Sequence, residues 1–373
     1  MKLRKLLQCP ILMMFGILCM AGLIGYLCKK DTLFSQMENR YLEKRPRISV
    51  QGLLDATYMR DFETYTNEQI PLRDILINLK AFSERVLLKN ENNGIVLGAD
   101  GYLFEKVLTK NPQLNKNEKI LETFLKEQER PIYVAIAPNA CEVMKEYVPA
   151  GIVRVNQEQE IRDFYQRIES DHVKTVDLLS PLRESSILQK YYRTDHHWTS
   201  EGAYVAYTEL CRVLQETPVA LTELEPEEVP DFYGTLYAKY KGGLLPPDTI
   251  LRYDIPIKSL TIQSEKHDTL YDRSKDKVYD KYASFLYGNP GMSTISAQNA
   301  GNGRTLIVFK DSYANCLIPF LTYQYDTIIV VDLRYHKDNV SDLLKNNPTA
   351  DILLLYNFSH LSDDNHFYRI LEK

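Results

Sequence analysis

The run Ile132-Tyr133-Val134-Ala135-Ile136-Ala137-Pro138 is short and almost wholly apolar, which is typical of a strand buried on both faces of a sheet. Similar apolar runs recur later in the chain, at residues 173–178, 305–309, 327–331 and 352–356. Segments with a helical spacing of apolar residues lie among them, at 157–168, 200–214, 313–321 and 340–345. Strands that alternate with helices predict an α/β domain in which a parallel sheet is covered by helices on both sides.

The alternation lapses between about residues 218 and 300, where Pro, Gly and charged residues separate short Tyr-rich pieces. We therefore expect an insertion of strands and loops there. Before the domain, residues 51–88 have a helical pattern that is interrupted at Ile70-Pro71. The predicted organisation is a cytoplasmic tail (1–8), a transmembrane anchor (9–28), a juxtamembrane helical region (29–90) and the α/β domain (91–373).

The uncharged run at residues 9–28 is long enough to cross a bilayer as a helix. Lys2, Arg4 and Lys5 precede it, which favours a cytoplasmic N-terminus and an exported remainder. A cleaved signal sequence is the alternative. No Ala-x-Ala site lies near the end of the run, and Leu27 stands where a lipoprotein signal has a small residue. We predict an uncleaved anchor in the cell membrane, with the bulk of the chain outside the cytoplasm.

Composition narrows the class of protein further. The chain has 373 residues, of which 44% are hydrophobic and 25% charged, so it can build a large core and resembles ordinary globular proteins. A net charge of −5 and the lack of a basic stripe argue against binding to nucleic acid. Outside the anchor the cysteines are Cys141, Cys211 and Cys316, a scattered set that predicts a fold independent of disulfide bonds.

A carboxylate, two imidazoles and the only tryptophan are consecutive in Asp195-His196-His197-Trp198. Thr199 or Ser200 can cap the helix that follows, so we expect the motif on a loop held by a helix N-terminus. A carboxylate bonded to one ring nitrogen of a histidine fixes its tautomer and leaves the other nitrogen free to take a proton from a hydroxyl. A polar turn is one alternative. A metal site of Asp195, His196 and His197 is another, although the usual His-x-x-x-His and Cys-x-x-Cys spacings are absent.

Ser312 is the residue that we would pair with His197 as a nucleophile. Residues 305–309 predict a buried strand, and the helix expected from Tyr313 onward contains Pro319, which should kink it. A serine at a strand-to-helix turn lies at the carboxyl edge of a parallel sheet, where such sheets bind ligands. The unpaired N–H groups of the helix N-terminus also suit an oxyanion. The alternative is that Asp311 or Ser312 only caps the helix.

Asn357 ends the apolar run 352–356, which puts its amide at the same expected sheet edge as Ser312. There the amide could donate a hydrogen bond to a developing oxyanion. Asn is also frequent at strand ends because it favours turns. Both interpretations stay open at this point.

The stretch Thr194-Asp195-His196-His197-Trp198-Thr199 resembles the signature for which the DHHW proteins of Firmicutes are named. Further stretches that resemble this family are Glu38-Asn39-Arg40, Gln69-Ile70-Pro71-Leu72-Arg73-Asp74, Gly101-Tyr102-Leu103-Phe104, Phe232-Tyr233-Gly234-Thr235 and Lys310-Asp311-Ser312-Tyr313. Together they span nearly all of the part that we expect to be exported.

More distantly, the Asp-x-His-Trp-Thr pattern and the later Asp-Ser pair resemble the SGNH-hydrolase-like domains of alginate O-acetylation proteins. This resemblance implies a flavodoxin-like parallel sheet sandwiched by helices. It also implies that the usual SGNH order is circularly permuted, so that Asp-x-His precedes the serine. Lys310 stands where the usual Gly-Asp-Ser motif has Gly, and His196 where many of the alginate proteins have Thr.

The same resemblance implies a role for each candidate residue. Asp195 becomes the orienting acid, His197 the base and Ser312 the nucleophile of a Ser-His-Asp triad, while Asn357 falls in the SGNH block that carries Asn. The sequence thus predicts a membrane-anchored serine O-acyltransferase or esterase, with no cofactor and no metal, that acts on an acetylated cell-envelope or exported polysaccharide.

Transfer of the acyl group to a sugar and its hydrolysis by water are both compatible with the sequence. The resemblance implies transfer, with a membrane-bound acyltransferase as the acyl donor. The alternative function is that of a non-catalytic glycan-binding or envelope-assembly protein on the same fold. Two observations motivate it: the departure at Lys310 and the abundance of tyrosine, with 26 residues.

Overall fold

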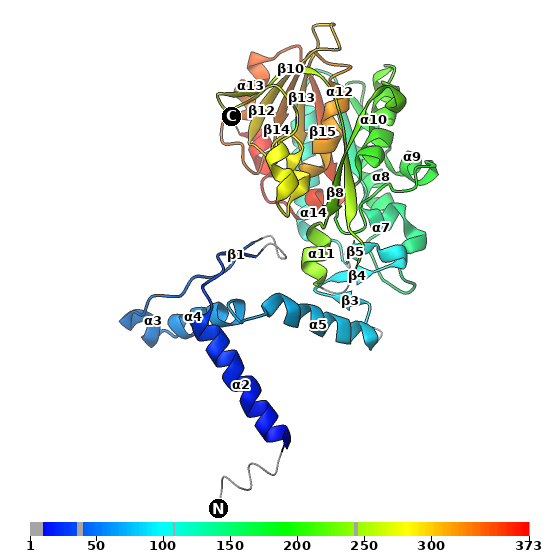
Figure 1. The fold of residues 1–373 in the computed structure, drawn as a ribbon. Helices are drawn as coiled ribbons and strands as arrows, with labels where there is room; N and C mark the ends of the chain where they lie inside the picture. The colour runs from blue at the N-terminus through cyan, green and yellow to red at the C-terminus, as the bar shows by residue number, and fades with distance from the viewer. Residues whose placement is uncertain (1–9, 36–39, 88, 107–108, 242–244, 373) are drawn as a thin grey trace, which may run out of the picture. The chain divides into compact units, whose positions relative to one another are not determined.

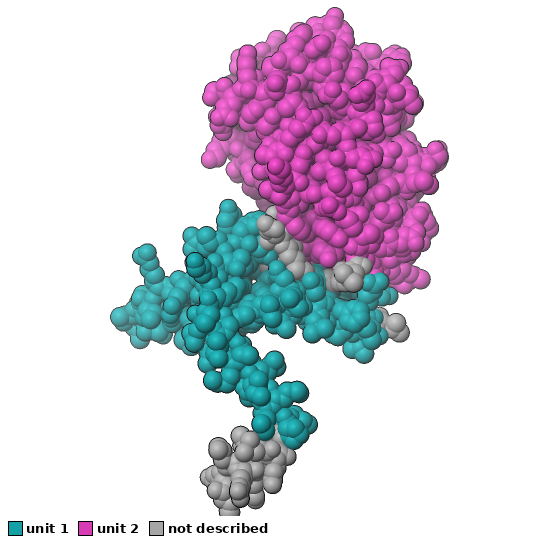
Figure 2. Space-filling model, viewed as in Figure 1, with its two compact units in different colours: residues 1–92, 241–244 teal, residues 93–240, 245–373 magenta. Residues whose placement is uncertain are grey.

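The computed structural model describes residues 10–35, 40–87, 89–106, 109–241 and 245–372. The chain forms two compact units, one of residues 1–92 with 241–244 and one of residues 93–240 with 245–373 (Figure 2). The predicted cytoplasmic tail, Cys9 of the predicted anchor and Glu38-Asn39 of the first family-like stretch lie outside the described residues.

An eight-stranded sheet forms the centre of the larger unit, and its strands lie in the order β11-β10-β12-β14-β13-β15-β6-β7 (Figure 1). Their bounds are β6 (Ile132–Ala137), β7 (Val173–Val176), β10 (Ile257–Ile262), β11 (Glu265–His267), β12 (Met292–Ala297), β13 (Thr305–Lys310), β14 (Thr327–Val331) and β15 (Asp351–Asn357). The strands from β14 to β7 pair in parallel, and the edge from β12 to β11 is antiparallel. The predicted α/β class with a largely parallel sheet is confirmed.

The parallel strands have the order of a flavodoxin-like fold whose first strand is β13. Counted from there, β13, β14, β15, β6 and β7 are strands 1 to 5, and they lie side by side as 2-1-3-4-5. Since β6 comes first along the chain, the fold is circularly permuted. In a flavodoxin-like sheet, ligands bind beyond the carboxyl ends of the first and third strands, where the strand order reverses. Those strands are β13 and β15 in this chain.

Side chains alternate between the two faces of the sheet and enter two separate cores. Val134, Ile307 and Leu354 are among those on one face, and Ala135, Val308 and Leu353 are among those on the other. The first core includes α6 (Pro112–Lys126), α8 (Gln157–Ile168), α13 (Val340–Asn346), α14 (Phe358–Asp363) and η7 (Phe367–Leu371). The second includes α7 (Ala140–Val143), α9 (Leu179–Glu184), α10 (Ser200–Leu214), η6 (Ser312–Cys316) and α12 (Ile318–Leu321). Helical segments therefore cover both faces, which leaves the carboxyl ends of the strands to form a site.

The segment predicted as an insertion has two parts. The later part supplies β10, β11 and β12, which extend the main sheet by antiparallel pairing. The earlier part contains a separate antiparallel pair, β8 (Pro226–Phe232) and β9 (Asp248–Tyr253), with α11 (Thr235–Tyr240) between them. Shorter elements of the larger unit are β4 (Ile95–Leu97), β5 (Leu103–Glu105), η1 (Ala99–Gly101), η2 (Lys145–Tyr147), η3 (Leu221–Glu223), η4 (Arg273–Lys277) and η5 (Lys281–Ser284).

The smaller unit contains α2 (Pro10–Cys28), a 19-residue helix that is long and apolar enough to cross a membrane and has no buried residue. The remaining elements of this unit are β1 (Phe34–Ser35), β2 (Arg40–Tyr41), α3 (Val50–Leu54), α4 (Thr57–Glu68), α5 (Arg73–Val86) and β3 (Glu91–Asn92). Glu68 at the end of α4 accepts a hydrogen bond of 2.6 Å from Arg40, and the amide of Gln69 bonds the backbone of Thr32. These bonds tie the chain after α2 to the end of α4.

The segment 313–321 differs from its prediction. It forms the 3-10 helix η6 and then the short helix α12, whereas the sequence pattern predicted one kinked helix. Pro319 lies in the first turn of α12, where its missing N–H costs no hydrogen bond, so the proline starts a new helix instead of bending one. The other helices and strands predicted in the larger unit are present and differ only at their ends.

Replacing Gly202 by alanine should destabilise the larger unit by about 2 kcal/mol or more, because a Cβ there would lie 2.1 Å from the carbonyl oxygen of Lys190. Urea unfolding of the full chain in detergent measures the loss. Arg212→Ala is the matched control, since Arg212 lies on the same helix with its side chain 71% exposed. Equal stability of the two variants would contradict the close packing of α10 against residue 190.

Candidate active site

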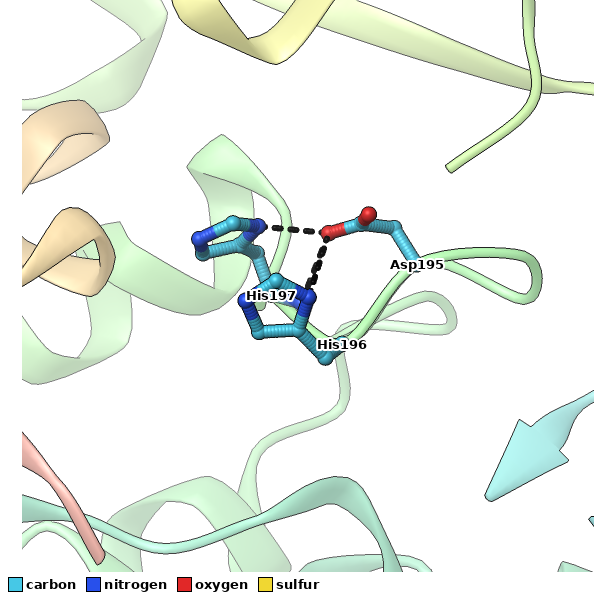
Figure 3. Close-up of side chains that lie close together, drawn as sticks. All are labelled: Asp195, His196 and His197. Atoms are coloured by element: carbon cyan, nitrogen blue, oxygen red, sulfur yellow. Dashed lines mark hydrogen bonds and ion pairs between the residues drawn. The ribbon is translucent and has the colours of Figure 1, made fainter. Parts of the chain in front are cut away.

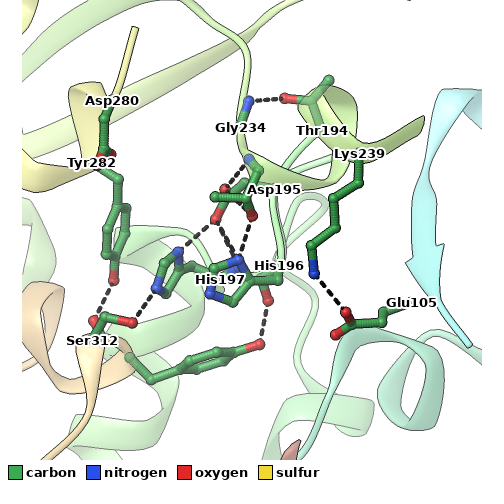
Figure 4. A network of polar contacts seen from close by, with 12 residues as sticks. Glu105, Thr194, Asp195, His196, His197, Gly234, Lys239, Asp280, Tyr282 and Ser312 are labelled. Atoms are coloured by element: carbon green, nitrogen blue, oxygen red, sulfur yellow. Dashed lines mark hydrogen bonds and ion pairs between the residues drawn. The ribbon is translucent and has the colours of Figure 1, made fainter. Parts of the chain in front are cut away.

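The structure brings Asp195, His197 and Ser312 together in one line of hydrogen bonds. His197 Nδ1 lies 2.5 Å from Asp195 Oδ1, and His197 Nε2 lies 2.7 Å from Ser312 Oγ (Figures 3 and 4). Asp195 and His197 are buried, whereas Ser312 is half-buried and reaches a cavity. The two segments are 115 positions apart in sequence. An acid, a base and a hydroxyl therefore stand in the geometry that activates a serine.

The loop that carries Asp195 and His197 is fixed from both sides. Before it, the backbone N–H and hydroxyl of Thr194 donate to the buried carboxylate of Asp248, at 2.8 and 2.7 Å. After it, Thr199, one of the two cap residues that the sequence offered, caps α10 by accepting from Gly202 N at 3.0 Å. Between them, the fully buried indole of Trp198 donates to the carbonyl of Tyr313 at 2.8 Å. This last bond ties the histidine loop directly to the turn that carries Ser312.

The carboxylate of Asp195 accepts more than the histidine ring. Its Oδ1 also accepts the backbone N–H of His197, and its Oδ2 accepts the backbone N–H and the hydroxyl of Thr235. Burial alone would raise the pKa of Asp195, but the neighbouring His196 and His197 and these hydrogen bonds bring it well below its ordinary value. Gly234 permits this approach, because a Cβ there would lie 2.2 Å from the Cβ of Asp195. The acid therefore stays ionised at neutral pH.

Ser312 lies on a turn that joins the two strands at the switch point. β13 ends at Lys310, and Asp311 stands between this strand and Ser312. Asp311 accepts from Tyr313 N through Oδ1 and from Asn357 N through Oδ2, at 2.8 and 2.7 Å. Asn357 ends β15, so Asp311 links the carboxyl ends of β13 and β15. Asp311 is the N-cap of η6, as one alternative had it, and this leaves Ser312 free for the bond to His197.

Tyr282, which the sequence did not single out, covers one face of the His197 ring. The two rings are stacked with centroids 3.8 Å apart and planes 11° from parallel. The hydroxyl of Tyr282 donates to the carbonyl of Ser312 at 3.1 Å, and burial raises its pKa well above the ordinary value. A neutral aromatic face on His197 stabilises the imidazolium that forms when the ring takes a proton.

Asn357 lies at the cavity, but its amide is already hydrogen bonded. Its Nδ2 donates to the carbonyl of Ala137 at 3.0 Å and to Asn139 Oδ1 at 2.8 Å, while its Oδ1 accepts from Ser359 N. Both amide hydrogens thus have acceptors other than a ligand. Donation to an oxyanion requires one of these bonds to break, and that role of Asn357 stays a prediction.

Lys310, the departure from the usual glycine, is buried beside the serine turn and does not line the cavity. Its Nζ donates to Asn289 Oδ1 at 2.7 Å and to Asn315 Oδ1 at 2.8 Å, and it lies 3.5 Å from Asp332. Burial lowers the pKa of Lys310 to about 8, and Asp332 offsets part of that fall. The lysine therefore fastens the start of the serine turn to the loop at Asn289.

The cavity beside Ser312 has a volume of about 330 Å³, and its lining includes His196, Thr235, Asn357 and Ser359. Arg334 also lines it. Its Nε and Nη2 are held by the carboxylate of Asp332 at 2.9 and 2.6 Å, so the guanidinium is fixed in orientation. The cavity thus combines the serine hydroxyl with a fixed positive charge and several hydrogen-bonding groups.

The metal alternative depends on whether the donor atoms of Asp195, His196 and His197 are free to bind an ion. Ligand atoms of Asp195, His196 and His197 lie within 4.8 Å of one another. However, Nδ1 of His197 bonds Asp195, Nδ1 of His196 lies 2.6 Å from Thr235 Oγ1, and Nε2 of His197 bonds Ser312. A metal ion here would have to displace these bonds, so the donor set fits a proton relay better than a coordination site.

Sequence reasoning missed Thr235, Tyr282 and Arg334, which complete the surroundings of the acid, the base and the cavity. The stretch Phe232-Tyr233-Gly234-Thr235 did carry a signal, because it belongs to the family-like stretches. Tyr282 and Arg334 lie outside those stretches, and their contacts depend on packing between distant segments.

Lys310→Met should lower the free energy of unfolding by about 1–3 kcal/mol, because it removes the donor to the amide oxygen of the buried Asn315 and one of the two donors to the amide oxygen of Asn289. Denaturant unfolding of the full chain measures the change, and Lys337→Met at an exposed position is the control. Unchanged stability of Lys310→Met would mean that the lysine does not hold the serine turn.

His196→Asn should make the chain less sensitive to acid. Burial and the neighbouring His197 lower the pKa of His196 from its ordinary 6.5 to about 4. Between those pH values the unfolded chain binds a proton at His196 that the folded chain does not. The contribution of His196 to the free energy of unfolding is therefore fully present above pH 6.5 and is lost as the pH falls toward 4. Unfolding curves at pH 7, 5.5 and 4.5 should fall more steeply for the wild type. Identical slopes would contradict the lowered pKa.

Comparison with known proteins places this geometry in a family. The family described as DHHW protein matches residues 115–331, more than half of the chain. A DHHW family protein from Eubacterium siraeum has the same fold, with a TM-score of 0.64 at 24% identity over 76% of this chain and 96% of that one. PatB1 of Bacillus cereus gives a TM-score of 0.59 at 20% identity over 73% of this chain and 98% of that one.

Among curated proteins, the chain is 26% identical over 302 residues to the probable alginate O-acetylase AlgJ of Pseudomonas fluorescens, and the match covers 73% of each chain. The match to the probable alginate O-acetylase AlgJ of Pseudomonas syringae is 27% identical and covers 61% of this chain and 58% of that protein. The matched family region includes the histidine loop and the serine turn, and the fold is that of a solved family member. The chain belongs to the DHHW protein family.

Proposed function

We propose that this protein is a serine O-acyltransferase that modifies a polysaccharide outside the cytoplasm, with Ser312 as nucleophile, His197 as base and Asp195 as orienting acid. The observation that carries the proposal is the bond of 2.7 Å between His197 Nε2 and Ser312 Oγ, next to the bond of 2.5 Å between His197 and Asp195. Relatives named as probable alginate O-acetylases support transfer of an acetyl group to a polysaccharide at the level of the family.

The chemistry follows the positions of the hydrogen bonds. Ser312 Oγ attacks the carbonyl carbon of an acyl ester as His197 Nε2 takes its proton, and the leaving alcohol departs with that proton. An acyl ester on Ser312 remains. A hydroxyl of the polysaccharide then gives its proton to His197 and attacks the acyl group, and Ser312 Oγ leaves with the proton. Water in place of the sugar gives hydrolysis, which is the esterase activity compatible with the sequence.

We propose three groups at the cavity as donors to the oxyanion. The backbone N–H of Ser312 is the first of η6 and belongs to the donors that a helix start leaves unpaired. Arg334 adds a positive charge whose orientation Asp332 fixes. Asn357 is the third candidate and would exchange its bond to Asn139 for one to the substrate.

The proposal also includes the location of the chain and the molecules that donate and accept the acyl group. We infer that residues 9–28, of which the structure describes helix α2, anchor the chain uncleaved, and that the larger unit is a single SGNH-like α/β domain on the outer side of the membrane. A membrane-bound acyltransferase would supply the acyl group, and an exported or cell-envelope polysaccharide would receive it. The uncharged, unburied α2 helix and the alginate O-acetylase relatives support this arrangement.

Ser312→Ala should lower the hydrolysis of 4-nitrophenyl acetate by about a thousandfold or more, because the residue that forms the acyl ester is gone. It should also abolish covalent labelling by a fluorophosphonate, measured by intact-mass spectrometry of the full chain in detergent. Ser359→Ala is the matched control, since Ser359 lines the same cavity, and this variant should still be labelled. Equal turnover by wild type and Ser312→Ala at every pH would end the proposal, and loss of activity on chelation would favour the metal alternative.

A further inference from the structure

His196 lines the cavity, lies next to the base His197 in the chain, and has no role in the proposed reaction. Its ring lies against that of His197 with centroids 3.8 Å apart and planes tilted by 37°. The side chain is 37% exposed and lines the cavity beside Ser312. In the described part of the chain, its Nδ1 bonds Thr235 and its Nε2 has no hydrogen-bond partner.

The hydrogen bonds around Thr235 fix the tautomer of His196. The hydroxyl of Thr235 has one hydrogen and lies 3.1 Å from Asp195 Oδ2 and 2.6 Å from His196 Nδ1. An ionised carboxylate only accepts, so the hydroxyl donates to Asp195. Thr235 Oγ1 must then accept from His196, which puts the ring hydrogen on Nδ1. His196 Nε2 is left as a lone-pair acceptor.

The direction of that lone pair follows from the position of Asp195. Nδ1 of both histidines faces its Oδ1, at 2.5 Å for His197 and 3.6 Å for His196 (Figure 3). Because each ring turns its Nδ1 toward this oxygen, both Nε2 atoms, on the opposite side of the rings, point away from the acid. One of them meets Ser312 Oγ, and the other opens into the cavity next to it.

The charge state of His196 agrees with this assignment. Burial and the neighbouring His197 lower its pKa to about 4, and Asp195 offsets only part of the effect. Other charged groups near the ring are Glu105 and Lys239, which pair with each other at 2.8 Å. His196 is therefore neutral at physiological pH, where it accepts a hydrogen bond and is a poor base.

We propose that His196 Nε2 binds the acceptor of the transfer reaction, by accepting a hydrogen bond from the hydroxyl next to the one that attacks the acyl group on Ser312. The substrate class is then a compound with adjacent hydroxyls, as on a sugar ring. The inference rests on the proposed function, since it requires an acyl ester on Ser312. No proton moves to His196, and the attacking hydroxyl gives its proton to His197 as before.

This arrangement would let the site discriminate between a sugar and water as acceptors of the acyl group. Water has no neighbouring hydroxyl for His196, so it attacks the acyl-serine without that contact. One additional hydrogen bond in the transition state corresponds to about tenfold in rate. The cavity would thus favour transfer over hydrolysis by contact with the acceptor alone.

Two substitutions of His196 distinguish the role of its Nδ1 from the role of its Nε2. Asparagine can keep a donor close to the position of Nδ1, for the bond to Thr235, but has no atom at Nε2. Glutamine can bring an amide oxygen close to the position of Nε2 and loses the donor at Nδ1. A purely structural role in orienting Thr235 and Asp195 predicts that Asn replaces His better than Gln, whereas acceptor binding predicts the reverse.

The test uses the full chain in detergent with 4-nitrophenyl acetate as donor, and cyclohexane-1,2-diol and cyclohexanol as acceptors. Mass spectrometry of the acetylated alcohols, compared with free acetate, gives the ratio of transfer to hydrolysis. Wild type should favour the diol over cyclohexanol by about tenfold or more. His196→Asn should bring that preference close to the statistical factor of about two, since the diol offers two equivalent hydroxyls, and His196→Gln should retain part of it.

Each result decides the question. No diol preference in a wild type that forms the acyl ester would overturn the role of His196 and leave the proposed function intact. A diol preference in His196→Asn equal to that of the wild type would also overturn the role of His196. So would a loss of 4-nitrophenol release in that variant as large as its loss of transfer. Absence of any acyl ester on wild-type Ser312 would overturn the proposed function and this inference together.

Discussion

A buried, ionised carboxylate is the constraint on which the rest of the site depends. Asp195 is 2% exposed, and an isolated charge at such a depth would be costly. The chain offsets that cost with donors from His197, two residues after the acid, and from Thr235, 40 residues after it. Because every one of those donors must be in place, the acid fixes the histidine loop and the start of α11 together.

The sheet supplies the second half of the arrangement. The carboxyl ends of β13 and β15 meet where the strand order reverses, and Asp311 joins them through bonds to Tyr313 and Asn357. Trp198 then bridges the sheet edge and the histidine loop through the carbonyl of Tyr313. The distance between His197 and Ser312 is therefore set by backbone contacts on both sides, and does not depend on the bond between the two side chains alone.

Much of this could be predicted from the sequence. Apolar runs of strand length alternating with helical spacings predicted the sheet, and the Asp-x-His and Asp-Ser pairs, read with the family resemblance, predicted which residues would meet. The strand order required the structure, because pairing partners in a parallel sheet are distant in sequence, and the resemblance alone had implied the permutation. The pattern at 218–300 suggested an insertion, but not that β10 to β12 would extend the main sheet.

Contacts within the site were harder to predict. Nothing in a single sequence says that Tyr282 stacks on His197, or that the amide of Asn357 is used by Ala137 and Asn139. Such contacts follow from side-chain packing once the backbone is placed. Lys310 is an example. In the sequence it only departs from the glycine of the usual motif, whereas in the fold its ammonium group lies among two amide oxygens and Asp332, away from the cavity.

The position of β15 has a consequence for how the molecule assembles. It pairs with β13 on one side and with β6 on the other, although it follows both of them in the chain. Without residues 351–357 the sheet would divide into the pair β6–β7 and the group of strands from β13 to β11, each with an unpaired edge where β15 now lies. The serine turn would also lose the bond between Asp311 and the backbone of Asn357. This one strand therefore joins the two parts of the sheet and anchors the nucleophile turn at the same time.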